Sequence, residues 1–235
     1  MARQSRRVDP PAQPVPGSEK QLVGRRVLAP LEYWLQHLHE LPTHGNRNLL
    51  ADHVLVAHLV AFLIPALKSL RRIEAGFEHR VARERFGLPR IPKSTLADAQ
   101  AIFNPALLEP IIADLRQRVP HLPHDPKLDA PLKTLTAVDG SFFRWLKCLV
   151  NFQHFFSEPP DGLPLQIGAA VIGTLLLALI IQDRPSSYDW AIMASVVGGL
   201  LPLDQETLEI MAHRRLERAR AANWQKEYRA RKRSG

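Results

Sequence analysis

The sequence predicts a mainly helical protein, and three observations lead to this fold class. Apolar residues make up 46% of the chain and charged residues 23%, which are the proportions of a globular protein. Most segments repeat their apolar residues with the period of about 3.6 that marks an α-helix. Only one short segment, residues 133–138, alternates like a strand. We therefore expect a helical N-terminal region, a single strand and a helical C-terminal region.

The first predicted elements are an arm and two helical segments. Residues 1–26 contain a cluster of prolines, which indicates an extended or disordered arm. A helix is predicted over 28–41, because its apolar side chains fall on one face: Leu31, Trp34, Leu35 and Leu38. A longer helical pattern covers 48–77, and Pro65 inside it predicts a kink or a break.

Two more helices are predicted before residue 120. Ser94 is a suitable N-cap for a short helix over 95–103. Asn104 as N-cap and Pro105 as the first residue begin the next helix, which we expect to reach about Val119. Four prolines within residues 120–131 then predict a linker.

After the strand, the pattern predicts helices over 142–155, 163–181, 188–200 and 204–228. The segment 163–181 contains no charged residue and is long enough to span a membrane. Pro164, Gln166 and two glycines weaken that interpretation, so we expect a buried helix. In the last helix, Asp204 as N-cap and Glu206 in the first turn favour a helix start.

The charge of the chain is unevenly distributed, although the total is +8. Three segments are basic, with net charges of +4 over 1–26, +5 over 65–93 and +7 over 213–235. The two segments between them, 27–64 and 94–212, carry −2 and −6. Basic blocks of this kind favour binding to a polyanion. The alternative is that the basic termini are solubilising tails.

The cysteine count and the N-terminal sequence bear on the cellular compartment. A single cysteine, Cys148, excludes an intramolecular disulfide and fits a reducing cytoplasm. Residues 1–20 contain no apolar segment of the kind found in secretory signals. The ten histidines show no spacing typical of a metal site. We therefore expect a cytoplasmic protein without a histidine-bound metal.

The most informative motif is Leu132–Lys147. Its first half contains Thr136-Ala-Val-Asp-Gly-Ser141 and its second half is Phe142-Phe-Arg-Trp-Leu-Lys147. Both halves resemble the DDE transposases of bacterial insertion sequences, in the group with the Y-R-E-K signature. In that family the two halves lie far apart in an RNase H-like catalytic domain. The segment Pro92–Asp98 resembles the helical region that precedes this domain.

The resemblance implies a catalytic domain with an internal deletion. It assigns the first metal-binding aspartate of the family to Asp139, but the family's glutamate falls on Gly140 and its second aspartate has no counterpart. Intact relatives use Mg²⁺ held by three carboxylates, and one aspartate cannot hold a metal pair. We therefore expect a truncated, inactive transposase that binds no cofactor. The alternative role for Asp139 is to cap the helix that follows it.

The resemblance also divides the chain and suggests a partner. The expected parts are an arm (1–26), a helical DNA-binding or assembly region (27–119), a Pro-rich linker (120–131), the remnant of the catalytic domain with its one strand (132–212), and a basic helical tail (213–235). The expected partner is double-stranded DNA, which in relatives means the terminal inverted repeats. The candidate DNA-binding residues, besides the tail from Arg214 to Arg233, are Arg71, Arg72, Arg80, Arg83, Arg85, Lys93, Arg144 and Lys147.

Several alternatives remain open from the sequence. The last two candidates, Arg144 and Lys147, are equally explained by a solvated helix face. The chain is either a remnant that associates with itself or with an intact transposase at the bacterial nucleoid, or a DNA-binding regulator or inhibitor of transposition. A third class is a small membrane protein with a basic tail. The implied deletion removes nothing from residues 27–119, so we expect this region to fold alone. It leaves the strand 133–138 without the other strands of its sheet, so we expect the C-terminal half to be poorly stable or to self-associate.

Overall fold

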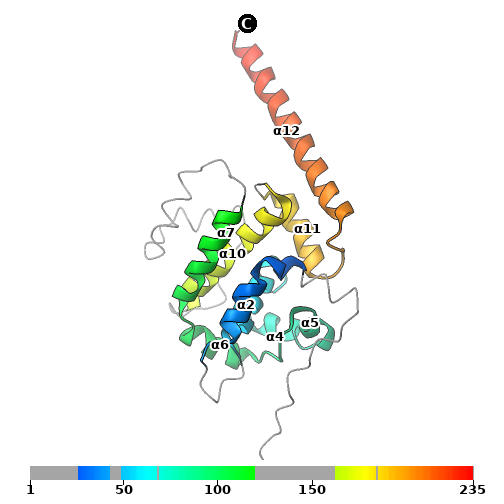
Figure 1. Cartoon of the computed structure of the whole chain (residues 1–235). Helices are drawn as coiled ribbons and strands as arrows, with labels where there is room; N and C mark the ends of the chain where they lie inside the picture. The colour runs from blue at the N-terminus through cyan, green and yellow to red at the C-terminus, as the bar shows by residue number, and fades with distance from the viewer. Residues whose placement is uncertain (1–25, 43–48, 68, 120–161, 184, 235) are drawn as a thin grey trace, which may run out of the picture.

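Helices form the regular structure of the chain wherever its conformation is described. The computed structural model describes residues 26–42, 49–67, 69–119, 162–183 and 185–234 (Figure 1). Within these ranges no strand occurs, which confirms the mainly helical class. The strand predicted at 133–138 and the helix predicted at 142–155 lie outside the described residues.

The first elements agree with the helices expected from the sequence. They are η1 (Ala29–Leu31), α2 (Glu32–His39), α3 (Ala51–Leu63) and α4 (Leu70–Gly76). The break predicted at Pro65 is confirmed, because α3 ends two residues before it. Ile64 has an extended backbone, with φ −106° and ψ 101°, which is the conformation that a following proline favours.

The next elements are α5 (Arg80–Phe86), α6 (Lys93–Ile102), η2 (Pro105–Leu108) and α7 (Glu109–Arg118). The Asn104 cap is confirmed, because its Oδ1 accepts the N–H of Ala106 at 3.1 Å. The prediction that Ser94 is the N-cap of this helix was wrong. Pro92 occupies the N-cap position, and its carbonyl accepts the N–H of Leu96, so Ser94 lies inside the helix.

Three helices make up the described C-terminal part: α10 (Leu163–Ile181), α11 (Ser187–Val197) and α12 (Gln205–Ser234). A capping box that sequence reasoning missed begins α11, in which Ser186 Oγ accepts the N–H of Asp189 and Asp189 Oδ2 accepts the N–H of Ser186. The Asp204 cap of α12 is confirmed by a 2.9 Å bond from the Thr207 N–H to Asp204 Oδ1.

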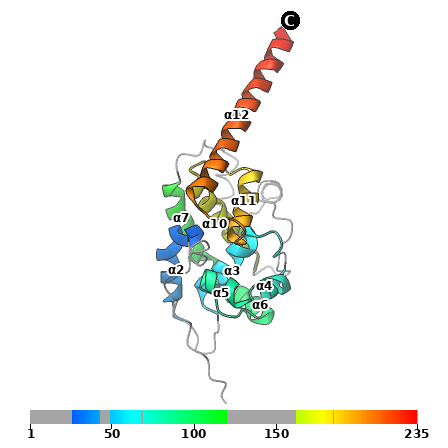
Figure 2. The same ribbon diagram turned by 90° about the vertical axis from the view of Figure 1, so that its right-hand side faces the viewer.

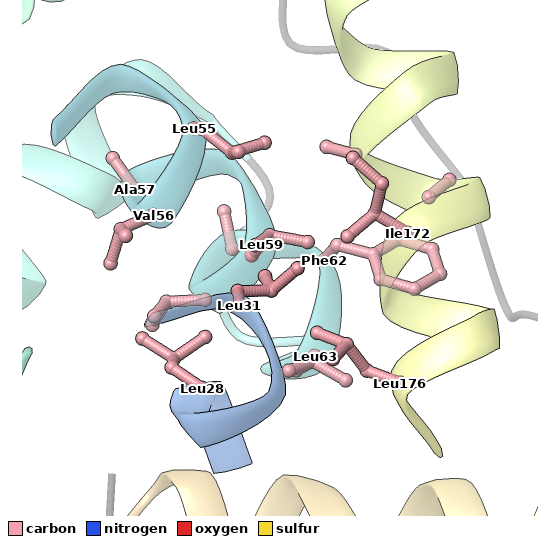
Figure 3. Packing of buried hydrophobic residues seen from close by; sticks show 14 of the residues in the cluster. Leu28, Leu31, Leu55, Val56, Ala57, Leu59, Phe62, Leu63, Ile172 and Leu176 are labelled. Atoms are coloured by element: carbon pink, nitrogen blue, oxygen red, sulfur yellow. The ribbon is translucent and has the colours of Figure 1, made fainter. Parts of the chain in front are cut away.

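The apolar helix α10 is the centre of the core. It packs against α3, η2 and α7 from the N-terminal part and against α11 and α12 from its own part. The expectation of a buried helix is confirmed, since 13 of its 19 residues are buried. Figure 3 shows how Phe62 and Leu63 of α3 face Ile172 and Leu176 of α10. Helices from both described parts of the chain therefore cover most of its apolar surface.

A glycine allows the close approach of α3 and α10. A Cβ atom added at Gly173 would lie 2.7 Å from Phe62 Cδ1, which is closer than van der Waals contact allows. The ring of Phe62 in turn meets Trp190 of α11 edge to face, with 5.3 Å between the centroids. The contact at Gly173 thus holds three helices together.

One apolar cluster joins the two parts of the chain. It includes residues from Val27 to Leu115 and residues from Leu165 to Met211, and α10 supplies nine of its members. Each fully buried Leu, Ile or Val contributes about 1.5–3 kcal/mol to folding. The described residues of 27–119 therefore share their core with α10, so a fragment that ends at residue 119 would expose a large apolar surface.

A buried polar pair connects α3 to α6. His58 is 1% exposed and Gln100 is 3% exposed. The geometry fits a neutral imidazole that donates from Nδ1 to the Val54 carbonyl at 2.7 Å and accepts at Nε2 from the Gln100 amide at 2.6 Å. Burial lowers the pKa of His58 from its ordinary value of 6.5 to about 4.

This pair predicts a loss of stability in acid. Between pH 6.5 and 4 the unfolded chain binds a proton at His58 that the folded chain does not. The free energy of unfolding therefore decreases as the pH is lowered through this range. The expected loss is about 3 kcal/mol, measured by urea unfolding at a series of pH values. The variant His58→Leu is the control, and an equally steep pH dependence in this variant would contradict the assignment.

Candidate nucleic-acid interface

Five of the eight individually named DNA-binding candidates lie on two short helices. Arg71 and Arg72 belong to α4, and Arg80, Arg83 and Arg85 belong to α5. Lys93 is the first residue of α6. The remaining candidates, Arg144 and Lys147, lie outside the described residues, as does Asp139, the one predicted catalytic residue.

Four of these basic residues are exposed on α4, α5 and α6, and we refer to them together as the α4–α6 surface: Arg71, Arg72, Arg80 and Lys93. Ser69 caps α4 by accepting the N–H of Arg72, which fixes the start of that helix. The guanidinium of Arg72 donates to the Ala66 carbonyl at 3.2 Å, and Arg80 pairs with Glu84 on its own helix. Exposed contacts of this kind are weak in water, so these cations remain available to a polyanion.

Arg85 has a structural environment instead. It is partly buried, and its Nη1 donates to the Val197 carbonyl at the C-terminal end of α11, 3.4 Å away. A cation at this position interacts favourably with the helix dipole. Gly199 has φ +78°, and an added Cβ there would lie 2.0 Å from Arg85 Nη1, so the guanidinium occupies the space beside a residue without a side chain.

Arg83 is also partly buried, and sequence reasoning could not separate it from its neighbours. Its Nε is buried without a hydrogen-bond partner among the described residues. We therefore leave Arg83 and Arg85 out of the α4–α6 surface. Nothing in the spacing of the arginines in 80–85 distinguishes the exposed Arg80 from the two that turn toward the protein.

The long helix α12 is fixed to the body near its start by Arg215. Its Nη1 donates to Asp189 Oδ1 at 3.2 Å and its Nη2 donates to the Ile181 carbonyl at 3.3 Å. Its Nε also lies 3.5 Å from Asp183 Oδ2. Asp189 is fully buried and also caps α11, so this one arginine connects α12 to the end of α10 and the beginning of α11.

Two neighbouring arginines add to the same attachment. The guanidinium carbons of Arg214 and Arg218 lie 5.9 and 5.7 Å from the centre of the Tyr188 ring, within the range of a cation–π interaction. The first three arginines of the basic tail therefore have partners within the protein. Sequence reasoning grouped them with the DNA-binding tail because their carboxylate and aromatic partners are distant in the sequence or on another helix.

Beyond this attachment α12 extends away from the body. Both views show it leaving the body on the side opposite to α4, α5 and α6 (Figures 1 and 2). Every side chain described from Leu216 onward is exposed. Trp224 and Tyr228 are stacked on each other one helical turn apart, with 5.5 Å between the ring centroids, and are 65% and 57% exposed.

A cluster of two histidines and one aspartate was not expected from the sequence. His39 Nδ1 lies 3.0 Å from Asp52 Oδ2, and His53 Nε2 lies 3.7 Å from the same oxygen. All three could offer a ligand atom to a metal ion. The cluster forms because the end of α2 meets the start of α3, which spacing along the chain does not reveal.

The hydrogen bond at His53 opposes metal binding in this cluster. His53 Nδ1 accepts the backbone N–H of Leu50 at 3.3 Å, so a neutral ring carries its proton on Nε2, the atom that faces Asp52. A metal bound at Nε2 would move that proton to Nδ1, where it would meet the N–H of Leu50. Burial lowers the pKa of His53, and although Asp52 opposes this shift, His39 adds to it.

The helix α10 is long and apolar enough to cross a membrane by length and composition alone. It is the single such helix among the described residues, and 72% of its most apolar window is buried inside the protein. A buried core helix passes the same test, so this observation is weak support for a membrane span.

No match was found when the chain was compared with models of protein families, with curated proteins and with solved structures.

Proposed function

We propose that this chain binds double-stranded DNA, and that it is the remnant of an insertion-sequence transposase whose catalytic core is largely deleted. The observation that carries the proposal is positive charge on exposed helices. Residues 65–93 have a net charge of +5 and residues 213–235 a net charge of +7. Lys and Arg side chains at such surfaces release counterions from DNA when they bind its phosphates.

The identity of the remnant is supported by the resemblance of Leu132–Lys147 and Pro92–Asp98 to the transposase family. A DNA-binding regulator of transposition shares these features and remains within the proposal. In either case the protein acts on DNA in the bacterial cytoplasm, without metal-dependent chemistry of its own.

The binding proposal predicts an affinity that falls steeply with salt. We expect the full-length chain to bind a fluorescent 30-base-pair duplex at low salt, measured by anisotropy across a salt series. The slope of log K against log[salt] should be roughly −0.9 per phosphate contacted. Replacing Arg71, Arg72 and Arg80 by alanine removes up to three phosphate contacts, so the slope should become less negative by as much as about 2.7.

A single substitution on another helix provides the control. Arg116 is exposed on α7, and Arg116→Ala removes one charge outside the α4–α6 surface. This variant should change the slope less than Arg71→Ala alone. Absence of binding at low salt, or an affinity independent of salt, would refute the proposed function. If the chain keeps the sequence preference of intact transposases, a duplex that carries the terminal inverted repeats of its insertion sequence should also outcompete a random duplex.

A further inference from the structure

The distal half of α12, residues 219–234, extends away from the other described helices (Figures 1 and 2). Among the described side chains of the helix, Met211 is the last that is buried, and Arg218 makes the last described contact with another helix, at Tyr188. Sixteen residues follow that contact. Isolated helices of about this length are marginal in water, because most helical stability in proteins comes from packing. A partner that covers this segment would therefore stabilise it as a helix.

The charge of the segment identifies the chemistry of that partner. It contains six Lys or Arg residues and one Glu, which gives a net charge of +5. A second copy of the same segment would repel it. A polyanion would not, and the exposed pair of Trp224 and Tyr228 adds apolar surface beside the cations.

The distribution of charge around the helix favours a groove over a flat surface. Arg220 and Arg229 are nine residues apart, or about two and a half turns, and so lie on opposite sides of the helix. Lys232 lies on a third side, about 60° from Arg229 by the same geometry. A helix on a membrane surface separates an apolar face from a basic face, and this segment does not.

We propose that residues 219–234 lie in the major groove of double-stranded DNA and are stabilised as a helix by that contact. A helix is about 10–12 Å across and the major groove is about 12 Å wide. Cations on opposite sides of the helix then reach the phosphates on both walls of the groove. Apolar contact from Trp224 and Tyr228 suits the thymine methyl groups on the groove floor. The inference rests on the proposed DNA binding and assigns this segment its place on the duplex.

Hydrogen exchange of the full-length chain tests the proposal. With a saturating 20-base-pair DNA duplex, amides in 219–234 should exchange roughly tenfold more slowly, as expected for a locally stabilised segment. The triple variant Arg220→Gln, Arg229→Gln and Lys232→Gln should lose most of this protection. The matched control is the Arg71, Arg72 and Arg80 triple alanine variant, which removes the same charge from the α4–α6 surface and should retain the protection once DNA is saturating.

Duplex RNA of the same length separates groove binding from general attraction to phosphate. The major groove of RNA is deep and narrow, so RNA should leave 219–234 unprotected. Equal protection by RNA, or protection by anionic vesicles but not by DNA, would overturn the inference. DNA binding without any protection of 219–234 would overturn it while leaving the proposed function intact. Absence of DNA binding by the wild-type chain would refute both.

Discussion

Replacing Arg215 by alanine is expected to destabilise the protein by about 3–5 kcal/mol. The substitution leaves the carboxylate of Asp189, which is fully buried, without its cationic partner. It also removes the bond to the carbonyl of Ile181 at the end of α10. Urea unfolding followed by circular dichroism would measure the loss as a lower midpoint.

Two further variants make the cause of that loss clear. Arg220→Ala removes an equivalent charge from an exposed position of the same helix and should change stability by less than about 0.5 kcal/mol. Combining Arg215→Met with Asp189→Asn removes both charges and should recover part of the stability, because no unpaired buried charge remains. If the Arg215→Ala variant were as stable as the Arg220→Ala variant, the pair of Arg215 and Asp189 would make no net contribution to stability.

Cutting the chain between residues 120 and 161 should leave its two parts associated. The described core places α10 against α3, η2 and α7, so the apolar surfaces of both parts cover each other. With an engineered protease site in this interval, the cut protein should elute from a sizing column as one species. The two fragments should separate only in denaturant.

The isolated N-terminal part is the companion to that experiment. A chain ending at residue 119 exposes the α3 surface that α10 covers, and we expect it to lack a cooperative unfolding transition. This outcome differs from the independent folding expected from the sequence alone. A stable, cooperatively unfolding fragment 1–119, or separation of the cut parts in native buffer, would contradict the shared core.

Local signals in the sequence predicted most of the described elements. Pro65 marked the end of α3, and Asn104 and Asp204 marked helix starts, because caps and proline act through their immediate neighbours. The start of α6 was missed because Pro92 and Ser94 both fit an N-terminus. The burial of α10 was predicted, but the helices that cover it were not, because its even apolar surface fits a sheet or a helix equally well.

The sequence predicted which segments of the candidate interface are basic, but it did not predict which of their side chains are exposed. Composition located the basic segments, yet Arg85 and Arg215 hold other parts of the protein together through partners more than twenty residues away. The His39, Asp52 and His53 cluster was missed for the same reason, since two helix ends meet there. Long-range contacts of this kind depend on the tertiary fold, which spacing along the chain does not specify.

The place of α10 in the core also governs how the chain can fold as it is synthesised. Its partner α3 ends at Leu63, and α10 begins at Leu163. Ribosomes add about 5–20 residues per second, so roughly 5–20 s pass between the synthesis of α3 and the synthesis of the helix that covers it. During that interval the α3 side chains that α10 later covers are exposed to chaperones and to other nascent chains. Contacts between such distant segments also slow folding after release, so the yield of soluble protein should depend on temperature and on chaperone supply.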